Sequence, residues 1–344
     1  MTVTTPPPGP AGPIHDLTVN VWRFAAVRAF VELGCADHLA GGPLPLAELA
    51  RRCGADAWAL ERLLRVLTPL EIVDAVDGDG YALGGSAHAL RDADDSLRWM
   101  VLIQGDPVWW DALRRLPDTV RTGRPEIHGG YGTPWEYLAG APEADDRFQR
   151  FMTARTLRIS AAVAESVDDG HTVVDVGGGR GTLLAAVLRA RPGCRGVLLD
   201  LPHEAAGARA YLAGREVAGR CEVVAGDFFG EVPGGGDVYL LASVLHDWGP
   251  AEARKILDNV RAAMAPGARL LCADILLRED RRAPHPSNEL GLRIMSLHPG
   301  GRERTLAEYE ALLAGSGLRL TGVADLPDGF SLVSAVPGEA ADGG

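Results

Sequence analysis

Polar residues that can bind a ligand or move a proton follow several short apolar runs in the second half of the chain. Asp200 and Asp227 each end such a run, and the next run is followed by His246 beside Asp247. In an open parallel sheet, ligands bind at the carboxyl ends of the strands, so we expect these side chains to gather at one edge. A lone histidine is more often structural, but His246 stands at this edge beside an acid. We therefore take it as a candidate catalytic residue.

A glycine cluster follows a β-branched run that ends at Asp175, and an apolar helical pattern comes next. The stretch predicts a strand, a tight turn and a helix N-terminus, where free N–H groups suit an anionic ligand group. A dinucleotide fingerprint needs a glycine at the position of Thr182. The spacing present, Gly177-x-Gly179-x-Gly181, is typical of S-adenosylmethionine (SAM) methyltransferases. A glycine-rich turn without a ligand is the alternative.

The acids after the second and third runs predict contacts to a nucleoside. Asp200 can accept two hydrogen bonds from a ribose diol. Asp227 offers a carboxylate to the adenine amino group, and Phe228 offers an apolar ring for the adenine face. One acid at the end of a strand means little. Three in this order, beginning with Asp175, are a specific indication of a nucleoside cofactor.

Composition limits the class of protein. The 344-residue chain is 47% apolar and 23% charged, with a formal net charge of −12. Phosphate binding needs a basic surface, so no nucleic-acid partner is expected. No apolar run reaches about 18 residues, so no membrane span is expected either. We expect residues 1–13, which lack basic residues, to be disordered rather than a signal peptide.

The five cysteines are scattered and odd in number, and no two form a C-x-x-C pair. This spacing predicts reduced, mostly buried thiols rather than a disulfide framework or a zinc site. With no export signal expected, the chain is predicted to be cytoplasmic. No metal site is expected.

Residues 14–95 predict a winged-helix domain. The first helical pattern, over 17–39, is apolar on most of its circumference, which suits deep burial or packing against a partner chain. Two short helical patterns joined at Gly54 predict a helix-turn-helix. Asp-Gly pairs between β-prone runs in 72–83 predict a hairpin that completes the wing.

A winged helix raises the hypothesis of a DNA reader. Residues 44–91 contain five arginines and seven acidic residues, a net charge of −2. A helix that meets a phosphate backbone is not expected to be neutral or acidic. We therefore favour a structural or dimer-forming winged helix over DNA binding and over a regulator that senses a small molecule.

Residues 96–165 predict a helical connector rich in aromatic side chains, which either fill a core or line a pocket for a flat substrate. From residue 172 onward, strand and helix patterns alternate, so 166–344 predicts a Rossmann-like α/β domain with a mostly parallel sheet. The expected strands are 172–176, 196–200, 221–227, 237–242, 269–274, 318–323 and 331–336.

Five motifs, in order, resemble the plant caffeic-acid-type O-methyltransferases and their bacterial relatives, which methylate phenolic hydroxyls of polyketides and other secondary metabolites. The motifs are DVGGG (175–179), DLPH (200–203), GDFF (226–229), LHDW (245–248) and GGRERT (300–305). The resemblance covers the chain from about Leu17 to its end. It implies SAM as the cofactor, a homodimer formed through the winged-helix domain, and a small aromatic hydroxylated acceptor.

The resemblance also implies site residues. His246 matches the general base, and Asp274 and Glu303 match the acids that flank it. The residues expected to bind SAM are Gly177, Gly179, Asp200, Leu201, Asp227, Phe228 and Ser243. The residues expected to touch the acceptor are Phe148, Met152, Asp247 and Met295.

Four positions depart from the plant pattern. Ala242 replaces a lysine near the adenine, and Ser243 replaces a tryptophan, where its hydroxyl offers SAM a polar contact. Asp274 is one methylene shorter than the family's glutamate, which puts its reach to His246 in question. Gly291 stands where the family has an acid.

The implied reaction is an in-line attack of an acceptor oxygen on the methyl group of SAM. A phenol has a pKa of about 10 and a histidine about 6.5, so full proton transfer is uphill by roughly 5 kcal/mol. The nearby sulfonium, and Glu303 or Asp274 behind the imidazole, are expected to reduce that gap. The competing hypothesis is a SAM-binding relative that hydroxylates or decarboxylates instead. Catechol, anthracycline-like, indole and quinone acceptors all stay open.

Overall fold

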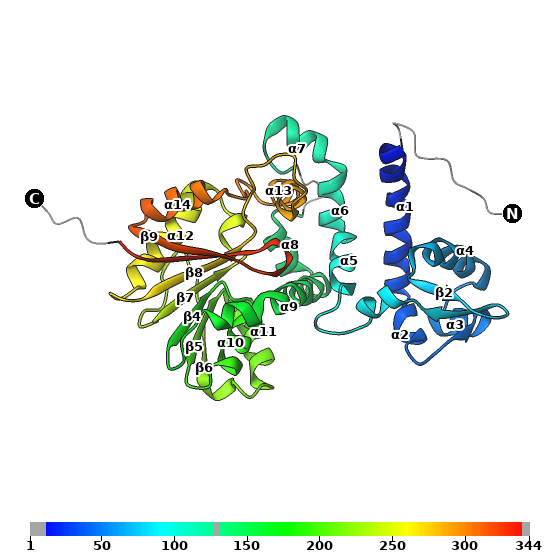
Figure 1. The fold of residues 1–344 in the computed structure, drawn as a ribbon, viewed down its shortest axis with the longest axis horizontal. Coiled ribbons are helices and arrows are strands. Elements are labelled where there is room, and N and C mark those ends of the chain that lie inside the picture. Colours follow the sequence, from blue (N-terminus) through cyan, green and yellow to red (C-terminus); the bar gives the residue numbers. More distant parts are fainter. Residues whose placement is uncertain (1–11, 127–130, 339–344) are drawn as a thin grey trace, which may run out of the picture. The chain divides into compact units, whose positions relative to one another are not determined.

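In the computed structural model, described over residues 12–126 and 131–338, the chain forms two compact units that divide between Asp106 and Pro107 (Figure 1). The first unit contains α1 (Gly12–Glu32), α2 (Cys35–Leu39), β1 (Leu44–Pro45), α3 (Leu46–Cys53), α4 (Ala57–Leu67), η1 (Thr68–Leu70), β2 (Val73–Ala75), β3 (Gly80–Leu83), η2 (Gly85–Leu90) and α5 (Arg98–Gln104). The expected connector over 96–165 is not a unit of its own, because α5 belongs to the first unit and the helices after it to the second.

The helices of the second unit are α6 (Pro107–Arg114), α7 (Leu116–Thr122), α8 (Pro134–Gly140), α9 (Pro142–Glu165), α10 (Thr182–Ala190), α11 (Pro202–Ala213), α12 (Pro250–Ala263), α13 (Pro286–Leu297) and α14 (Leu306–Gly315). Its strands are β4 (Thr172–Val176), β5 (Arg195–Asp200), β6 (Cys221–Ala225), β7 (Val238–Ala242), β8 (Arg269–Asp274), β9 (Leu318–Asp325) and β10 (Ser331–Pro337). Short 3-10 turns are η3 (Ala218–Arg220), η4 (Leu245–Asp247) and η5 (Pro327–Gly329).

The first helix begins earlier than the sequence predicted. α1 starts at Gly12, with Pro13 in its first turn. A proline is well tolerated there, because the first N–H groups of a helix have no partner within the helix. The prediction of disorder over 1–13 is therefore wrong for these two residues, and its other residues lie outside the described part of the chain.

Gly34 divides the helix that was predicted over 17–39 into α1 and α2. Its φ of 65° is left-handed and ends the first helix. Within its own unit α1 packs against α4 and α5 and buries Phe30 and Val31, whereas Trp22 leaves 78% of its area exposed. An exposed apolar helix face of this kind is the surface that a partner chain covers. None of the described helices, α1 included, combines the length and apolarity needed to cross a bilayer.

The predicted winged-helix elements are present in the first unit. Gly54 ends α3 with a φ of 62°, and Asp56 caps α4 by accepting a hydrogen bond from the backbone N–H of Ala59. β2 and β3 form the predicted hairpin, and β1 adds a third antiparallel strand beside β3.

The second unit is built on a seven-stranded sheet of order β6-β5-β4-β7-β8-β10-β9. The strands from β4 to β8 pair in parallel, and β10 pairs antiparallel with both β8 and β9. The mostly parallel sheet was thus predicted correctly, and its two antiparallel strands lie together at one edge. The ends of β4 and β8 match the predicted strands at 172–176 and 269–274.

The third predicted strand, over 221–227, is too long. β6 ends at Ala225, and the chain then turns, with Oδ1 of Asp227 accepting a hydrogen bond from the N–H of Phe229. Aspartate side chains commonly stabilise turns in this way. Asp227 therefore stands in a loop beyond the strand rather than at its last residue.

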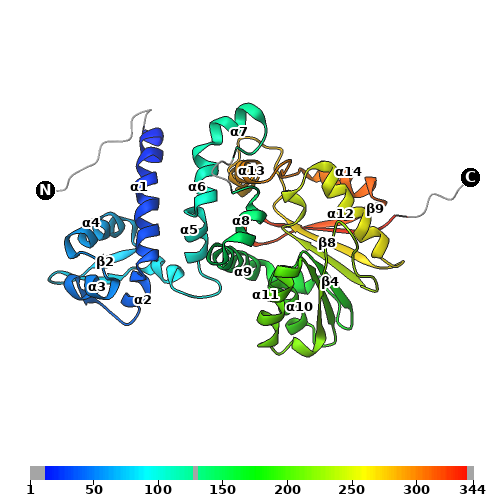
Figure 2. The same ribbon diagram turned by 180° about the vertical axis from the view of Figure 1, so that it is seen from behind.

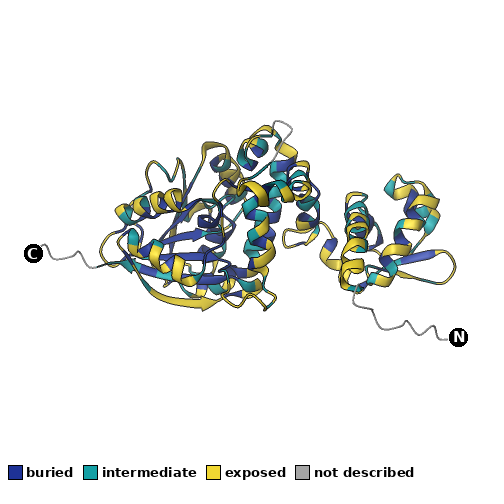
Figure 3. Ribbon diagram, turned by 90° about the horizontal axis from the view of Figure 1, so that it is seen from above, coloured by how far each residue is buried: buried dark blue, intermediate teal, exposed yellow. Residues whose placement is uncertain are grey.

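Alternate residues of the central strands pack into two separate cores, as the pleat of a strand requires. Val173 lies in the core formed with α9, α10, α11 and α13, and Val174 lies in the core formed with α12 and α14. Figures 1 and 2 show α10 and α11 on the face of the sheet opposite α12 and α14. The central strands are largely buried (Figure 3). The carboxyl ends of the strands are therefore held by packing on both faces.

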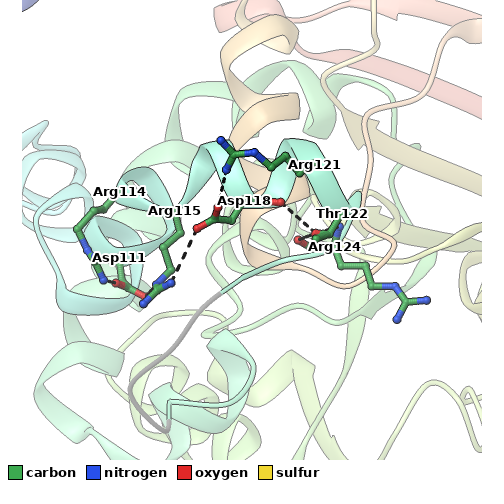
Figure 4. A network of polar contacts seen from close by, with 7 residues as sticks. All are labelled: Asp111, Arg114, Arg115, Asp118, Arg121, Thr122 and Arg124. Carbon is green, nitrogen blue, oxygen red and sulfur yellow. Dashed lines mark hydrogen bonds and ion pairs between the residues drawn. The ribbon is translucent and has the colours of Figure 1, made fainter.

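α6 and α7 carry a partly exposed network of charged side chains (Figure 4). Asp111 accepts a 2.5 Å hydrogen bond from Arg114 and lies 3.3 Å from Arg115, while Asp118 accepts a 2.7 Å hydrogen bond from Arg121. Pairs three and four residues apart stabilise a helix by only a few tenths of a kcal/mol each. We therefore assign this network to the stability of the two helices.

All five cysteines are free thiols, and three of them are buried. Cys35 and Cys53, which lie 18 residues apart in the sequence, have their Sγ atoms 3.4 Å apart. Burial is the main cause that raises the pKa of the Cys35 thiol. Both thiols are therefore protonated at neutral pH.

Candidate active site

Glycines shape the turn between β4 and α10. Gly177, Gly179 and Gly181 have φ values of 71°, 54° and 82°, a region that residues with a Cβ atom rarely adopt. At Gly178 a Cβ atom would lie 2.6 Å from Oδ2 of Asp175. The turn thus needs glycine for backbone conformation at three positions and for space at a fourth. It leads into the N-terminus of α10, whose free N–H groups suit a carboxylate.

Asp200, the last residue of β5, is tied to this turn. Its Oδ2 accepts a 2.8 Å hydrogen bond from the N–H of Gly179, and its Oδ1 accepts a 2.7 Å hydrogen bond from the N–H of Leu201. Burial raises the pKa of Asp200, against the opposing effect of these two donors. Each carboxylate oxygen keeps a second lone pair, which suits the two hydroxyls of a ribose.

Phe228 packs against the glycine turn. A Cβ atom at Gly177 would lie 3.4 Å from the Phe228 ring. The rings of Phe229 and Trp248 lie 5.0 and 6.0 Å from Phe228, and 4.7 Å from each other. Asp227 is exposed at the same turn. An aromatic wall beside the glycine turn, with a carboxylate next to it, fits an adenine ring and its amino group.

A left-handed backbone and a buried arginine position His246. Ser243 directly follows β7 and has a φ of 56°, uncommon for a residue with a side chain. The chain then forms η4 (Leu245–Asp247). The guanidinium of Arg304 donates hydrogen bonds of 2.6 and 2.8 Å to the carbonyls of Leu245 and Trp248. Both ends of this segment are thus fixed, and His246 is 5% exposed.

Three carboxylates surround the imidazole of His246. Its Nδ1 lies 3.2 Å from Oε1 of Glu303 and 3.7 Å from Oδ1 of Asp274. Its Nε2 lies 3.5 Å from Oδ1 of Asp247, an oxygen that also lies 3.4 Å from Nε2 of His298. The Nδ1 atom has no aligned hydrogen bond among the described residues, so these contacts are ion-pair contacts. Asp274 reaches His246 despite its short side chain, but Glu303 is the nearer acid.

Burial dominates the protonation of this cluster. It lowers the pKa of His246, against Asp247 and Asp274, whose charges raise it. Burial also raises the pKa of Asp247 and Asp274 to about 6 and that of Glu303 to about 7, and it lowers the pKa of His298 to about 3. At neutral pH the imidazole of His246 is therefore unprotonated and able to accept a proton.

The second unit thus contains a turn, an acid and an aromatic wall that fit a nucleoside carrying an amino-acid tail. It also contains the buried neutral imidazole of His246. A methyl donor of that shape, held near a base, suits methylation of an acidic hydroxyl. Among the residues that the structure describes, no group of three or more His, Cys, Asp or Glu side chains is arranged to hold a metal ion.

Comparison with known protein families identifies the family of the chain. Residues 113–319 match the O-methyltransferase domain, and residues 16–90 match the O-methyltransferase dimerisation domain. The chain belongs to the O-methyltransferase family. The methyltransferase uses SAM, and its winged-helix unit carries the family's dimerisation domain, which supports a homodimer.

Several characterised proteins resemble the methyltransferase over most of their length. The mitomycin biosynthesis 6-O-methyltransferase of Streptomyces lavendulae is 38% identical over 89% of this chain and 88% of its own. The crystal structure of LaPhzM, 35% identical, superposes with a TM-score of 0.88 over 94% of this chain and 98% of its own. That of NcsB1, 31% identical, has a TM-score of 0.76 over 91% and 95%, and it holds SAM and 2-hydroxy-5-methyl naphthoic acid.

A series of ring contacts joins the helical segment of the methyltransferase to the base. The Phe148 ring lies 5.7 Å from that of Trp135, which lies 5.4 Å from the ring of His298. His298 in turn contacts Asp247, the neighbour of His246. The structure therefore connects two of the residues expected to touch the acceptor, Phe148 and Asp247, with the candidate base.

Other expected contacts stay predictions. Met152 and Met295 are half-buried on α9 and α13, and an apolar side chain there suits an aromatic acceptor. Leu201 follows β5 and is 39% exposed, as a residue that packs on a bound nucleoside must be. Within residues 12–126 and 131–338 the hydroxyl of Ser243 makes no hydrogen bond, and its left-handed backbone is the property that the structure reveals.

Four residues around His246 were not found from the sequence. Arg304 lies in the GGRERT motif, so the motif was the available signal. Tyr309 donates a 2.6 Å hydrogen bond to Asp274 from α14. Arg155 on α9 and Arg293 on α13 act electrostatically on Glu303. Arginines on helices usually face water, so nothing in their spacing indicated that these two lie inside.

Proposed function

We propose that His246 is the general base with which this methyltransferase moves a methyl group from SAM to a phenolic hydroxyl of an aromatic secondary metabolite. The observation that carries the proposal is the buried, unprotonated imidazole with Glu303 3.2 Å from its Nδ1. That arrangement leaves Nε2 to accept the acceptor's proton while a carboxylate stabilises the imidazolium that forms.

The energy of proton transfer explains why the acid behind the imidazole matters. SAM, when bound, supplies an electrophilic methyl group on a positively charged sulfur. A phenol with a pKa of about 10 gives up its proton to a histidine of pKa about 6.5 only at a cost of about 5 kcal/mol. Burial lowers the pKa of His246 and widens this gap, whereas the ionised forms of Glu303 and Asp274 narrow it. Proton transfer concerted with attack on the methyl group avoids the full cost.

Asp247 is suited to orient the acceptor hydroxyl. Its Oδ1 lies 3.5 Å from Nε2 of His246 and 3.4 Å from Nε2 of His298, so it stands on the side of the imidazole where the hydroxyl must approach. Holding the attacking oxygen in line reduces the entropic part of the barrier. The ring of Phe148 and the side chains of Met152 and Met295 are proposed to pack on the acceptor.

The SAM site is proposed to use the residues around the glycine turn. Gly177 and Gly179 leave room for the methionine part, and Asp200 accepts from the ribose. Phe228 and Leu201 pack on the adenine, and the exposed carboxylate of Asp227 accepts from the adenine amino group. Ser243, directly after β7, is proposed to offer SAM its hydroxyl.

The compartment follows from the thiols. Five free cysteines, two of them with Sγ atoms 3.4 Å apart, suit a reducing environment. We infer a cytoplasmic enzyme, which a thiol-labelling experiment on the protein isolated under alkylating conditions tests: labelling of all five cysteines supports it, and an isolated Cys35–Cys53 disulfide contradicts it.

The activity is tested with SAM labelled with deuterium in its methyl group and a panel of phenolic polyketide intermediates. Mass spectrometry is expected to find the trideuteromethyl group on an oxygen of at least one phenol. An unlabelled oxidised or decarboxylated product, formed while SAM is not consumed, would instead indicate different chemistry. Binding of SAM without any product from phenols would contradict the proposed acceptor class.

A further inference from the structure

Arg155 on α9 is half-buried, and its guanidinium makes no hydrogen bond or ion pair with the residues that the structure describes. Its Nη2 atom is buried and makes no hydrogen bond among the described residues. The guanidinium carbon lies 4.6 Å from the centre of the Phe330 ring, so the aromatic ring covers one face of the group. Stacking leaves the N–H donors at the edge of the plane unused. A buried cation whose donors are unused is costly, so an anion is expected to complete this site.

Arg293 on α13 packs beside Phe151, which lies one helical turn before Arg155 on α9. Its guanidinium carbon lies 5.8 Å from the centre of the Phe151 ring, and it makes no hydrogen bond or ion pair within the described part of the chain. After burial, the charge of Arg155 is the largest cause that lowers the pKa of Arg293, to about 10. Two like charges brought together from separate helices repel, and an anion between them removes the repulsion.

The acids of the site are engaged elsewhere. Asp274 accepts the Tyr309 hydroxyl, and Glu303 and Asp247 lie at ion-pair distance from His246. These carboxylates act on Arg155 through space, but none lies within ion-pair distance of either guanidinium among the described residues. These carboxylates balance part of the positive charge of the two arginines, but the guanidinium N–H donors are left without an acceptor among the described residues.

The charges also indicate the source of the missing anion. Arg155 acts on Asp274, Glu303, Asp247 and His246, the groups of the proton-transfer site. Arg293 lies over Phe151, whose ring is 6.4 Å from that of Phe148, and Phe148 begins the series of rings that leads through Trp135 to His298 beside Asp247. An anion at Arg155 therefore belongs with the acceptor.

We propose that Arg155 and Arg293 bind a carboxylate on the aromatic acceptor, so that the substrates of this methyltransferase are hydroxylated aromatic acids. A guanidinium matches the two oxygens of a carboxylate with parallel N–H donors. Such binding also offsets the repulsion between an anionic acceptor and the three acids around His246. The inference rests on the proposed function, since it concerns the acceptor of the same site.

Binding is measured by calorimetry with the full chain and S-adenosylhomocysteine present, so that no turnover is needed. The probes are 3-hydroxy-2-naphthoate and 2-naphthol, which differ only in the carboxylate. The wild type is expected to bind the naphthoate roughly 10- to 100-fold more tightly, the fold-change of a charged hydrogen bond. Equal affinity for both, or binding of neither, overturns the proposal.

Arg155→Gln is expected to abolish this preference and to leave the weak binding of 2-naphthol unchanged, and Arg293→Gln is expected to reduce the preference. Arg189→Gln, which changes an exposed arginine on α10, is the matched control and keeps it. If Arg155→Gln weakens the binding of both probes equally, the guanidinium only balances the charge of the acids around His246, and the proposal is wrong. Retained affinity for S-adenosylhomocysteine shows that a variant is folded.

Two further outcomes distinguish this inference from a role of Arg155 in cofactor binding and from the proposed function itself. A loss of S-adenosylhomocysteine affinity in Arg155→Gln, with the protein still folded by circular dichroism, would assign Arg155 to the carboxylate of the cofactor and overturn the proposal. Methyl transfer to phenols without regard to a carboxylate would overturn it and leave the proposed function intact. Binding of the naphthoate through Arg155 supports the inference even if no phenol is methylated.

Discussion

Tyr309 donates a hydrogen bond of 2.6 Å to Oδ2 of Asp274, and the other oxygen of that carboxylate lies 3.7 Å from Nδ1 of His246. The phenol therefore holds Asp274 from behind, on the side away from the imidazole. α14 thus contributes to the site through the buried hydroxyl of Tyr309.

Replacing Tyr309 by phenylalanine tests this relationship. The variant leaves a buried carboxylate short of one donor, which costs about 1–3 kcal/mol in the free energy of unfolding. Urea denaturation measures this loss, and the kcat of the variant is expected to fall as Asp274 becomes harder to ionise. Tyr211→Phe, at a half-buried tyrosine for which no hydroxyl hydrogen bond is described, is the control and is expected to unfold like the wild type.

His246→Gln is expected to lower kcat by about 10²- to 10⁴-fold, the usual contribution of a general base. The affinity for SAM is expected to stay within about twofold, because the residues proposed to bind SAM lie around the glycine turn. Single-turnover rates and calorimetry measure the two quantities. His88→Gln, at an exposed histidine of the first unit, is the control. If His246→Gln has the wild-type kcat, His246 is not the general base, and positioning of the substrates accounts for catalysis.

Glu303→Gln is expected to reduce kcat more than Asp274→Asn does, because Glu303 lies 3.2 Å from Nδ1 of His246 and Asp274 lies 3.7 Å away. Burial raises the pKa of Glu303 to about 7, so wild-type kcat is expected to rise with pH through that value as the carboxylate forms. The rise is expected to be missing from the pH profile of Glu303→Gln. If Asp274→Asn reduces kcat more than Glu303→Gln does, Asp274 rather than Glu303 is the main partner of His246.

The stability of the protein is expected to fall as pH rises from about 6.5 to 8. Burial raises the pKa of Asp175 and Glu303 to about 7 and that of Glu204 to about 8. A carboxyl with a raised pKa holds its proton in the folded state at a pH where the unfolded chain has lost it. The folded protein then binds more protons, so the free energy of unfolding decreases with pH.

The buried histidines do not reverse this sign. The pKa of His298 is lowered to about 3, so its opposing effect is confined to pH values below about 6.5, the ordinary pKa of histidine. Scanning calorimetry is expected to give a lower Tm at pH 8 than at pH 6.5, with a smaller difference in Glu303→Gln. A Tm that rises over this interval would show that the buried acids are already ionised at the lower pH.

The left-handed backbone of Ser243 predicts that this position tolerates glycine better than a β-branched residue. Ser243→Gly removes a Cβ atom at a φ of 56° and is expected to preserve the free energy of unfolding or raise it. Ser243→Val puts a β-branched side chain in the same conformation and is expected to cost roughly 1–3 kcal/mol. Ser334→Val, in the extended β10, is the control and is expected to be well tolerated. Denaturant unfolding that ranks the valine variants equally would remove the argument from backbone strain.

Features that depend on neighbouring residues were predictable from the sequence. Gly177, Gly179 and Gly181 are needed by the backbone of one turn. The short apolar runs of β4 and β8 each predict a buried strand, and both strands were located to the residue. His246 was found because it stands shortly after the end of a strand that the pattern identified. The family motifs, each a few residues long, could be recognised for the same reason.

Local patterns failed where a single residue redirects the chain. The apolar pattern over 17–39 continues through Gly34, but the left-handed conformation of that glycine ends α1. The strand pattern continues to Asp227, but a side-chain hydrogen bond to the N–H of Phe229 turns the chain after Ala225. Periodicity reports which face of an element is apolar and says little about where the element stops.

Only the tertiary structure decided what surrounds the base. Nδ1 of His246 lies 3.2 Å from Glu303 and 3.7 Å from Asp274, a difference of half an ångström. That difference depends on how α14, β8 and the segment after α13 pack together. Arg155 and Arg293 have the sequence pattern of ordinary helical arginines, and packing alone sets their guanidiniums against the rings of Phe330 and Phe151. Long-range contacts of this kind are set by the shape of the whole core, so no local pattern can encode them.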